Sequence, residues 1–125
     1  MNVILLFLCL LTLESVQFNL SSTHLSKTEP GVWVIDLRPD PNAEPYLKEF
    51  EITRVEGNTF SGKFYDTPFE NGLLNENWDE VYFAFTTSDQ NSTYFHSGYF
   101  DGDEVHGVTY SPERTFVMPW RGTKE

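Results

Sequence analysis

The sequence has few of the residues that disulfides and nucleic-acid binding require. Its 125 residues include one cysteine, Cys9, and 8 Lys and Arg residues against 19 Asp and Glu residues, for a formal net charge of −11. A single cysteine cannot close a disulfide within the chain. The shortage of basic residues argues against nucleic acid and anionic membrane surfaces as partners, because both require Lys and Arg to neutralise phosphate.

Local catalytic motifs are missing as well. The chain contains no G-x-S-x-G, P-loop, G-x-G-x-x-G or H-E-x-x-H sequence. Catalytic groups that are scattered over a barrel would leave no such motif, so an enzyme is not excluded, although a binding protein is favoured. We therefore assign no catalytic residue, no metal ligand and no cofactor from the sequence.

A long hydrophobic run is also absent. The longest apolar stretch, Val3 to Leu13, has eleven residues, too few to span a bilayer comfortably. It matches the apolar segment of a secretory signal peptide, although no basic residue precedes it and no Ala-x-Ala follows it. A structured N-terminal strand or helix is the alternative. We expect a secreted or periplasmic protein without stable membrane insertion after cleavage. Its parts would be a signal peptide (1–22), a flexible leader (23–30) and one domain (31–125).

What the chain does contain is a repeated pattern of alternating apolar runs and turn signals, which is typical of an all-β barrel or sandwich. Aromatic residues make up 16% of the chain, so much of the core must consist of Phe, Tyr and Trp. Most connections are short, which favours an antiparallel up-and-down meander closed into a small barrel over a two-sheet sandwich. The expected strands are about eight: 31–38, 46–55, 59–66, 72–75, 80–88, 93–100, 104–110 and 114–120, with the fourth short and irregular.

The register of the second hairpin can be constrained in advance. Four bulky residues should share its inner face: Phe50, Ile52, Phe60 and Phe64. Because side chains alternate along a strand and all four numbers are even, the connecting loop needs an odd number of residues. Glu56, Gly57 and Asn58 fit as a three-residue loop.

Two nearby histidines, His96 and His106, raise the question of a metal site. If Asp101 and Gly102 form a two-residue turn, Ser97 faces His106 across the hairpin. Residues that face each other share one side of the sheet, and successive residues alternate sides. The two histidines then point to opposite sides, so the pattern predicts no metal site.

The preceding loop indicates which side is inside. If 89–92 is a four-residue loop, Phe85 faces His96, and His96 lies on the inner face. Inward polar side chains then gather at one open end of the barrel, with a basic side chain nearby. An apolar hollow with a few polar groups is typical of a ligand site. The predicted ligand is a small, partly apolar molecule, and the predicted ligand-binding residues are Thr87, Tyr94, His96, Thr109 and Arg114.

Two other interpretations of these residues stay open. His96 could act as an acid or base with Asp66 or Asp89 in an isomerase or hydrolase, or it could be a core histidine bonded to Tyr94 or Thr87. The protein could also be a structural or interaction module whose outer surface includes Tyr99, His106 and Tyr110. With any of these functions, the barrel can also form a homo-oligomer.

The Gly-x-Trp sequence at Gly31 to Trp33 resembles the opening motif of the calycin barrels, which include lipocalins and avidins. In lipocalins a basic residue after the last strand packs over that tryptophan at the closed end, and the resemblance gives Arg121 this role. The comparison covers Gly31 to Arg121. It implies a barrel more strongly than any particular ligand.

Overall fold

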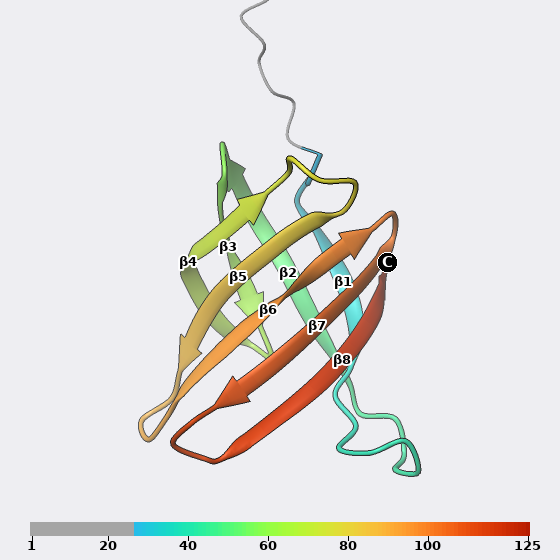
Figure 1. Cartoon of the computed structure of the whole chain (residues 1–125), viewed down its shortest axis with the longest axis vertical. Coiled ribbons are helices and arrows are strands. Elements are labelled where there is room, and N and C mark those ends of the chain that lie inside the picture. The colour runs from blue at the N-terminus through green and yellow to red at the C-terminus, as the bar shows by residue number, and fades with distance from the viewer. Residues whose placement is uncertain (1–26) are drawn as a thin grey trace, which may run out of the picture.

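The structure, a computed structural model, describes residues 27–125, which form an eight-stranded antiparallel barrel (Figure 1). The predicted signal peptide and the start of the leader lie outside the described residues. Within residues 27–125 there is no helix, and therefore none long and apolar enough to cross a membrane. The strands are β1 Gly31–Asp36, β2 Leu47–Glu56, β3 Thr59–Phe64, β4 Thr67–Asn75, β5 Val81–Ser88, β6 Thr93–Asp101, β7 Glu104–Ser111 and β8 Phe116–Lys124.

The strands pair in chain order, and β1 closes the barrel against β8. This confirms the predicted meander. The fourth strand is longer than expected and begins at Thr67, directly after the β3–β4 turn. The last strand is displaced toward the C-terminus, so Arg114 lies in the β7–β8 turn rather than in a strand.

The β6–β7 hairpin differs from the prediction in its turn but not in its faces. Asp101 pairs with Glu104, so the turn is Gly102–Asp103, with Gly102 at φ 59°. The glycine therefore occupies the first position of the turn, not the second as expected. Each β6 residue then faces a β7 residue two positions later than predicted. Because a shift of two residues keeps the same face of the sheet, the predicted inward and outward positions are unchanged. His96 and His106 face opposite sides as predicted, and residues 27–125 hold no group of three possible metal ligands.

The β2–β3 hairpin reaches the predicted faces by a different device. Its turn has two residues, Gly57 and Asn58, and the expected three-residue loop is wrong. The extra residue that brings the four bulky side chains to one face lies instead in a β-bulge between Ile52 and Arg54. The four bulky residues of this hairpin are all buried, as predicted.

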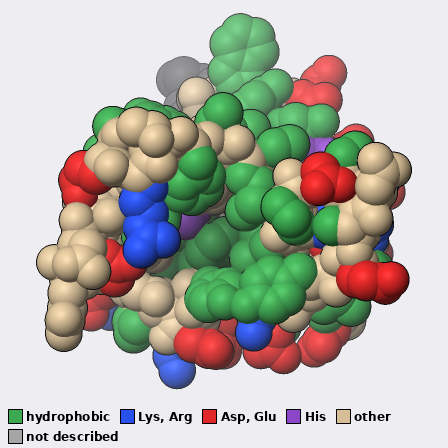
Figure 2. Space-filling model, turned by 90° about the horizontal axis from the view of Figure 1, so that it is seen from below, with side chains coloured by type: hydrophobic (Ala, Val, Ile, Leu, Met, Phe, Trp, Pro, Cys, Tyr) green, Lys and Arg blue, Asp and Glu red, His purple; other side chains and the backbone are tan. Residues whose placement is uncertain are grey.

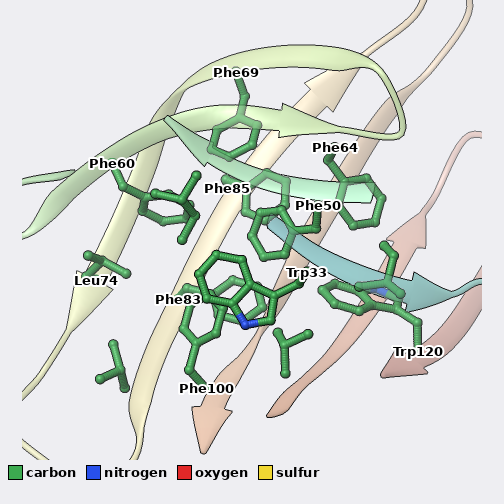
Figure 3. Packing of buried hydrophobic residues seen from close by; sticks show 14 of the residues in the cluster. Trp33, Phe50, Phe60, Phe64, Phe69, Leu74, Phe83, Phe85, Phe100 and Trp120 are labelled. Atoms are coloured by element: carbon green, nitrogen blue, oxygen red, sulfur yellow. The ribbon is translucent and has the colours of Figure 1, made fainter. Parts of the chain in front are cut away.

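Aromatic side chains fill the interior of the barrel (Figure 3). The ring of Phe50 lies at the centre of this cluster, with seven other ring centroids 5.3–6.3 Å away. Inward glycines make room for these rings: Gly107 pairs with Trp120, and Gly72 pairs with Phe60. A Cβ atom on Gly107 would lie 2.2 Å from the Trp120 ring. The predicted alternation of small and bulky inward residues is therefore present.

The two ends of the barrel have different connections. Segments 37–46, 65–66, 89–92 and 112–115 lie together at one end, which we call the mouth. At the opposite, closed end, the Lys124 Nζ atom lies 5.3 Å from the centroid of the Trp33 ring. The prediction that Arg121 packs there is wrong: β8 extends to Lys124, which pairs with Trp33 and leaves Arg121 exposed on the outer surface.

Candidate functional site at the barrel mouth

The five residues predicted to bind a ligand all lie in the mouth half of the barrel, but in two separate groups. Thr87, His96 and Thr109 are buried inside, whereas Tyr94 is half-buried and Arg114 is exposed at the rim. Figure 2 views the molecule from this end and shows a hollow among hydrophobic side chains, with Lys and Arg side chains near its edge.

The inner group forms a buried hydrogen-bonded chain across four strands. His96 Nε2 lies 2.8 Å from the Thr87 hydroxyl, and His96 Nδ1 lies 2.7 Å from the Thr109 hydroxyl. The indole N–H of Trp120 donates to the same Thr109 oxygen over 2.8 Å. Thr109 can then donate its own proton to Nδ1, which places the imidazole proton on Nε2 and makes Thr87 the acceptor. This arrangement gives both imidazole nitrogens, the Thr109 hydroxyl and the Trp120 indole N–H a partner.

The surroundings of His96 keep it neutral at pH 7. Its ring stacks on Phe85 with centroids 4.5 Å apart and contacts Phe64 at 4.3 Å. Burial lowers the pKa of His96 to about 4, because desolvation disfavours the charged imidazolium. Threonine hydroxyls, not the carboxylate of Asp66 or Asp89 that the alternative acid–base role requires, contact both ring nitrogens, as expected for a core histidine. His96 therefore links two threonine side chains in the interior, below the mouth.

The rim group combines Tyr94 and Arg114 with Asp89 of the β5–β6 loop. The Tyr94 hydroxyl donates to Asp89 Oδ2 over 3.0 Å, and the Arg114 guanidinium lies 6.0 Å from the centroid of the Tyr94 ring. Backbone N–H groups of Asn91 and Ser92 also donate to Asp89 and, with the Tyr94 hydroxyl, hold the pKa of Asp89 below its usual value. Burial, together with this bond to Asp89, raises the pKa of Tyr94.

A second aromatic and cationic group lies on the opposite wall, at the ends of β2 and β3. Lys48 Nζ lies 5.0 Å and 4.9 Å from the centroids of the Tyr46 and Tyr65 rings, a cation–π geometry. The two tyrosine hydroxyls are hydrogen-bonded to each other, which raises the pKa of Tyr65. Sequence reasoning missed this group. The sequence did contain a signal for it: Lys48 is two residues before Phe50, so the alternation of β2 places both side chains on the inner face.

The long β1–β2 loop beside the mouth is held by one carboxylate. Asp36 accepts two hydrogen bonds from the Arg38 guanidinium, at 2.8 Å and 2.5 Å, and one from each of the Arg38 and Tyr46 backbone N–H groups. The Arg38 side chain and these N–H groups lower the pKa of Asp36 to about 2. This clamp fixes both ends of a loop that contains three prolines.

Ser111 adds a polar group that sequence reasoning also missed. It is 1% exposed, lies on the inner face two residues after Thr109, and pairs with Phe116. Within residues 27–125 its hydroxyl has no hydrogen-bond partner. Such a group is uncommon in a native interior and calls for an explanation. The sequence could have revealed this inward position, because side chains alternate along β7 and Ser111 follows Thr109 by two residues.

Backbone strain is also concentrated at the mouth. Three non-glycine residues in the described part of the chain have positive φ: Tyr65 at 51°, Asp66 at 63° and Thr115 at 53°. All three lie in turns of the mouth, whereas the two-residue turns of the closed end place glycine in this conformation, at Gly57 and Gly102. Strained non-glycine residues often occur at functional sites.

Two further hollows lie away from the predicted residues. A surface groove of about 560 Å³ lies between the β1–β2 loop, including Arg38 and Pro41, and the β7–β8 residues His106 and Arg121. A pocket of about 350 Å³ at the closed end includes Trp33 and Lys124 in its walls.

Comparison with family models, with curated proteins and with solved structures found no match to this chain. The closed eight-stranded meander is compatible with a calycin-like barrel, and the likeness rests on the fold and the Gly-x-Trp sequence alone.

Proposed function

We propose that the protein is a secreted or periplasmic binding protein that holds a small, partly apolar molecule at the mouth of the barrel. The observation that carries the proposal is a pair of cations, Lys48 and Arg114, which lie beside tyrosine rings on opposite walls of the mouth and form no salt bridge within residues 27–125.

The distribution of inward polar groups supports this location. In the mouth half, the buried inward residues include Thr87, His96, Thr109 and Ser111. In the closed half, the buried inward residues of β5, β6 and β7 are apolar or glycine, as at Phe83, Phe100 and Val105. A few polar groups above an apolar floor are what a small-molecule site needs for orientation.

The core limits how deep such a ligand can sit. The centroids of the Phe69 and Phe85 rings are 4.1 Å apart, and Phe85 in turn stacks on His96. Because these rings occupy the centre, the ligand would rest at the mouth, above the phenylalanines. Its apolar part would contact Tyr94 and Phe116, whose ring centroids are 6.1 Å apart.

The two cations of the mouth suggest which polar group such a ligand carries. Lys48 and Arg114 lie on opposite walls, each beside tyrosine rings, and neither forms a salt bridge within residues 27–125. A planar apolar molecule with one anionic group would match this pairing of rings and charge.

The test is native mass spectrometry of the purified protein for a co-purified molecule, followed by titration with 1-anilinonaphthalene-8-sulfonate, an aromatic probe with one sulfonate. We expect one probe per barrel, and we expect Arg114→Gln and Lys48→Gln each to weaken probe binding about tenfold, the loss of one charge-assisted contact with the sulfonate.

The matched control is Arg54→Gln, which removes an exposed arginine from the outer surface of β2, where Arg54 pairs with Glu56. It should bind the probe as the wild type does. Equal binding by wild type, Arg114→Gln and Lys48→Gln would contradict a site at the mouth. A loss confined to Lys124→Gln would move the site to the closed-end pocket.

A further inference from the structure

The outer surface of the barrel carries more charged side chains on β2 to β4 than on β5 to β8. Outward residues on β2, β3 and β4 include six charged side chains: Glu49, Glu51, Arg54, Glu56, Lys63 and Glu70. On the four strands β5 to β8 the outward charged residues are Asp101, Glu104 and Arg121. Asp101 and Glu104 lie at the closed end, and Arg121 pairs with His106 on one side and with Asp36 of β1 on the other.

The uncharged part of β5 to β8 carries large apolar side chains instead. Six of them define what we call the aromatic face: Tyr82, Phe95, Tyr99, Val108, Tyr110 and Val117. Solvated positions of an antiparallel sheet are normally polar, so this face departs from the usual alternation.

Side chains of the aromatic face are joined into one surface. Phe95 pairs with Tyr110, which pairs with Val117 on the next strand. The Phe95 and Tyr110 rings stack with centroids 5.0 Å apart and an interplanar angle of 16°. The Tyr82 and Tyr99 rings are 5.9 Å apart. Val117 is 68% exposed and Tyr110 is 43% exposed, so much of this apolar area contacts solvent in a single barrel.

We propose that the aromatic face binds a second copy of this chain, forming a symmetric dimer of barrels packed sheet to sheet. Strand addition at an edge is unavailable, because the barrel is closed. A face-to-face contact between sheets is the arrangement that remains.

Charge is the argument for a second copy as the occupant. A basic partner would be recruited by acidic residues. The outward carboxylates of the strands beside it lie on β2 and β4, or at the closed ends of β6 and β7, and none is part of the aromatic face. Two copies of a chain with net charge −11 can approach closely only where neither presents its carboxylates. An uncharged apolar face matches itself without needing an opposite charge on the partner, as a two-fold interface requires.

The area of this face fits a dimer of modest stability. A sheet four strands wide and about eight residues long covers roughly 500 Å² per copy, from strand spacing and rise. Because these four strands curve around half of the barrel, this area is an upper bound. Two copies would bury at most about 1,000 Å² in total, near the lower limit for a specific interface. The dimer should therefore dissociate on dilution.

The experiment is sedimentation velocity of the purified protein over a concentration series from about 1 to 500 µM. We expect a shift from monomer to dimer across the series. Val117→Lys should move the midpoint at least tenfold higher in concentration, because it places a charged side chain in the apolar face of both copies. Leu73→Lys is the matched control: Leu73 is 57% exposed on β4, outside the aromatic face, and its variant should associate as the wild type does.

Near-ultraviolet circular dichroism would show that both variants retain the wild-type aromatic packing, since Val117 and Leu73 side chains point to solvent. If Val117→Lys lost this packing, Tyr110→Ser would replace it as the test variant. A wild-type protein that stays monomeric to 500 µM would overturn the proposal, and so would equal association by the aromatic-face variant and Leu73→Lys.

Discussion

The buried imidazole of His96 links the stability of the barrel to pH. Its pKa is about 4 in the folded chain, against about 6.5 in an unfolded one. As the pH falls below 6.5 the unfolded state takes up the proton first, so stability is present at neutral pH and declines toward pH 4. The loss attributable to His96 should approach about 3 kcal/mol.

Urea denaturation at pH 7 and pH 5 would measure this effect. We expect His96→Gln to be less stable than the wild type at pH 7, because it disturbs a buried network, but to lose less stability between the two pH values. His106→Gln, which changes an outward histidine beside Glu104, serves as the control and should keep the wild-type pH dependence. Identical pH dependence in wild type and His96→Gln would contradict the assignment.

Residue-level prediction from the sequence succeeded where strand alternation decides sidedness. The inward positions of Thr87, His96 and Thr109 follow from parity once the β5–β6 loop length is known, and that loop has the four residues expected. Alternation says nothing about distance, however. It could not show that both His96 nitrogens contact threonines, or that Trp120 joins them from β8.

At the scale of elements, the turns and bulges limited the prediction. The apolar pattern of the β2–β3 hairpin requires one extra residue relative to a two-residue turn, but it does not say where that residue lies. The sequence therefore could not distinguish a three-residue loop from a bulge in β2. The start of β4 was missed because Thr67 and Pro68 follow two left-handed residues, and a proline beside a tight turn resembles a loop signal. The group of Lys48, Tyr46 and Tyr65 at the mouth was missed because a single lysine among apolar positions forms no recognisable sequence motif.

The β7–β8 turn stores strain that a glycine would relieve. Thr115 has a φ of 53°, which is unfavourable for a β-branched side chain, and its N–H donates to the Pro112 carbonyl. Thr115→Gly should therefore raise the free energy of unfolding by about 1 kcal/mol. Thr123→Gly, at an extended strand position, should lower it by a similar amount. Thermal denaturation of both variants would test this, and a destabilised Thr115→Gly would show that the Thr115 side chain contributes more than its strain costs.

For the whole molecule, the excess of carboxylates opposes the folded state through repulsion among surface charges. Acidic side chains exceed basic ones by 11, and several of them are crowded on the outer surface of β2 to β4. Folding brings these charges closer together than they are in an extended chain, so screening them should favour the barrel. The screening length falls from about 10 Å at 0.1 M salt to about 3 Å at 1 M, which is shorter than most distances across a strand pair.

We therefore expect the melting temperature at pH 7.5 to rise by a few degrees as NaCl increases from 0.02 to 0.5 M, the equivalent of about 1 kcal/mol. Calorimetry at low micromolar concentration would separate this effect from dimer formation. Near the isoelectric point of about 4.5 the net charge vanishes, so the same change in salt should leave the melting temperature almost unchanged. An equal rise at both pH values would mean that salt acts on apolar burial rather than on charge, because burial does not depend on the protonation of surface carboxylates.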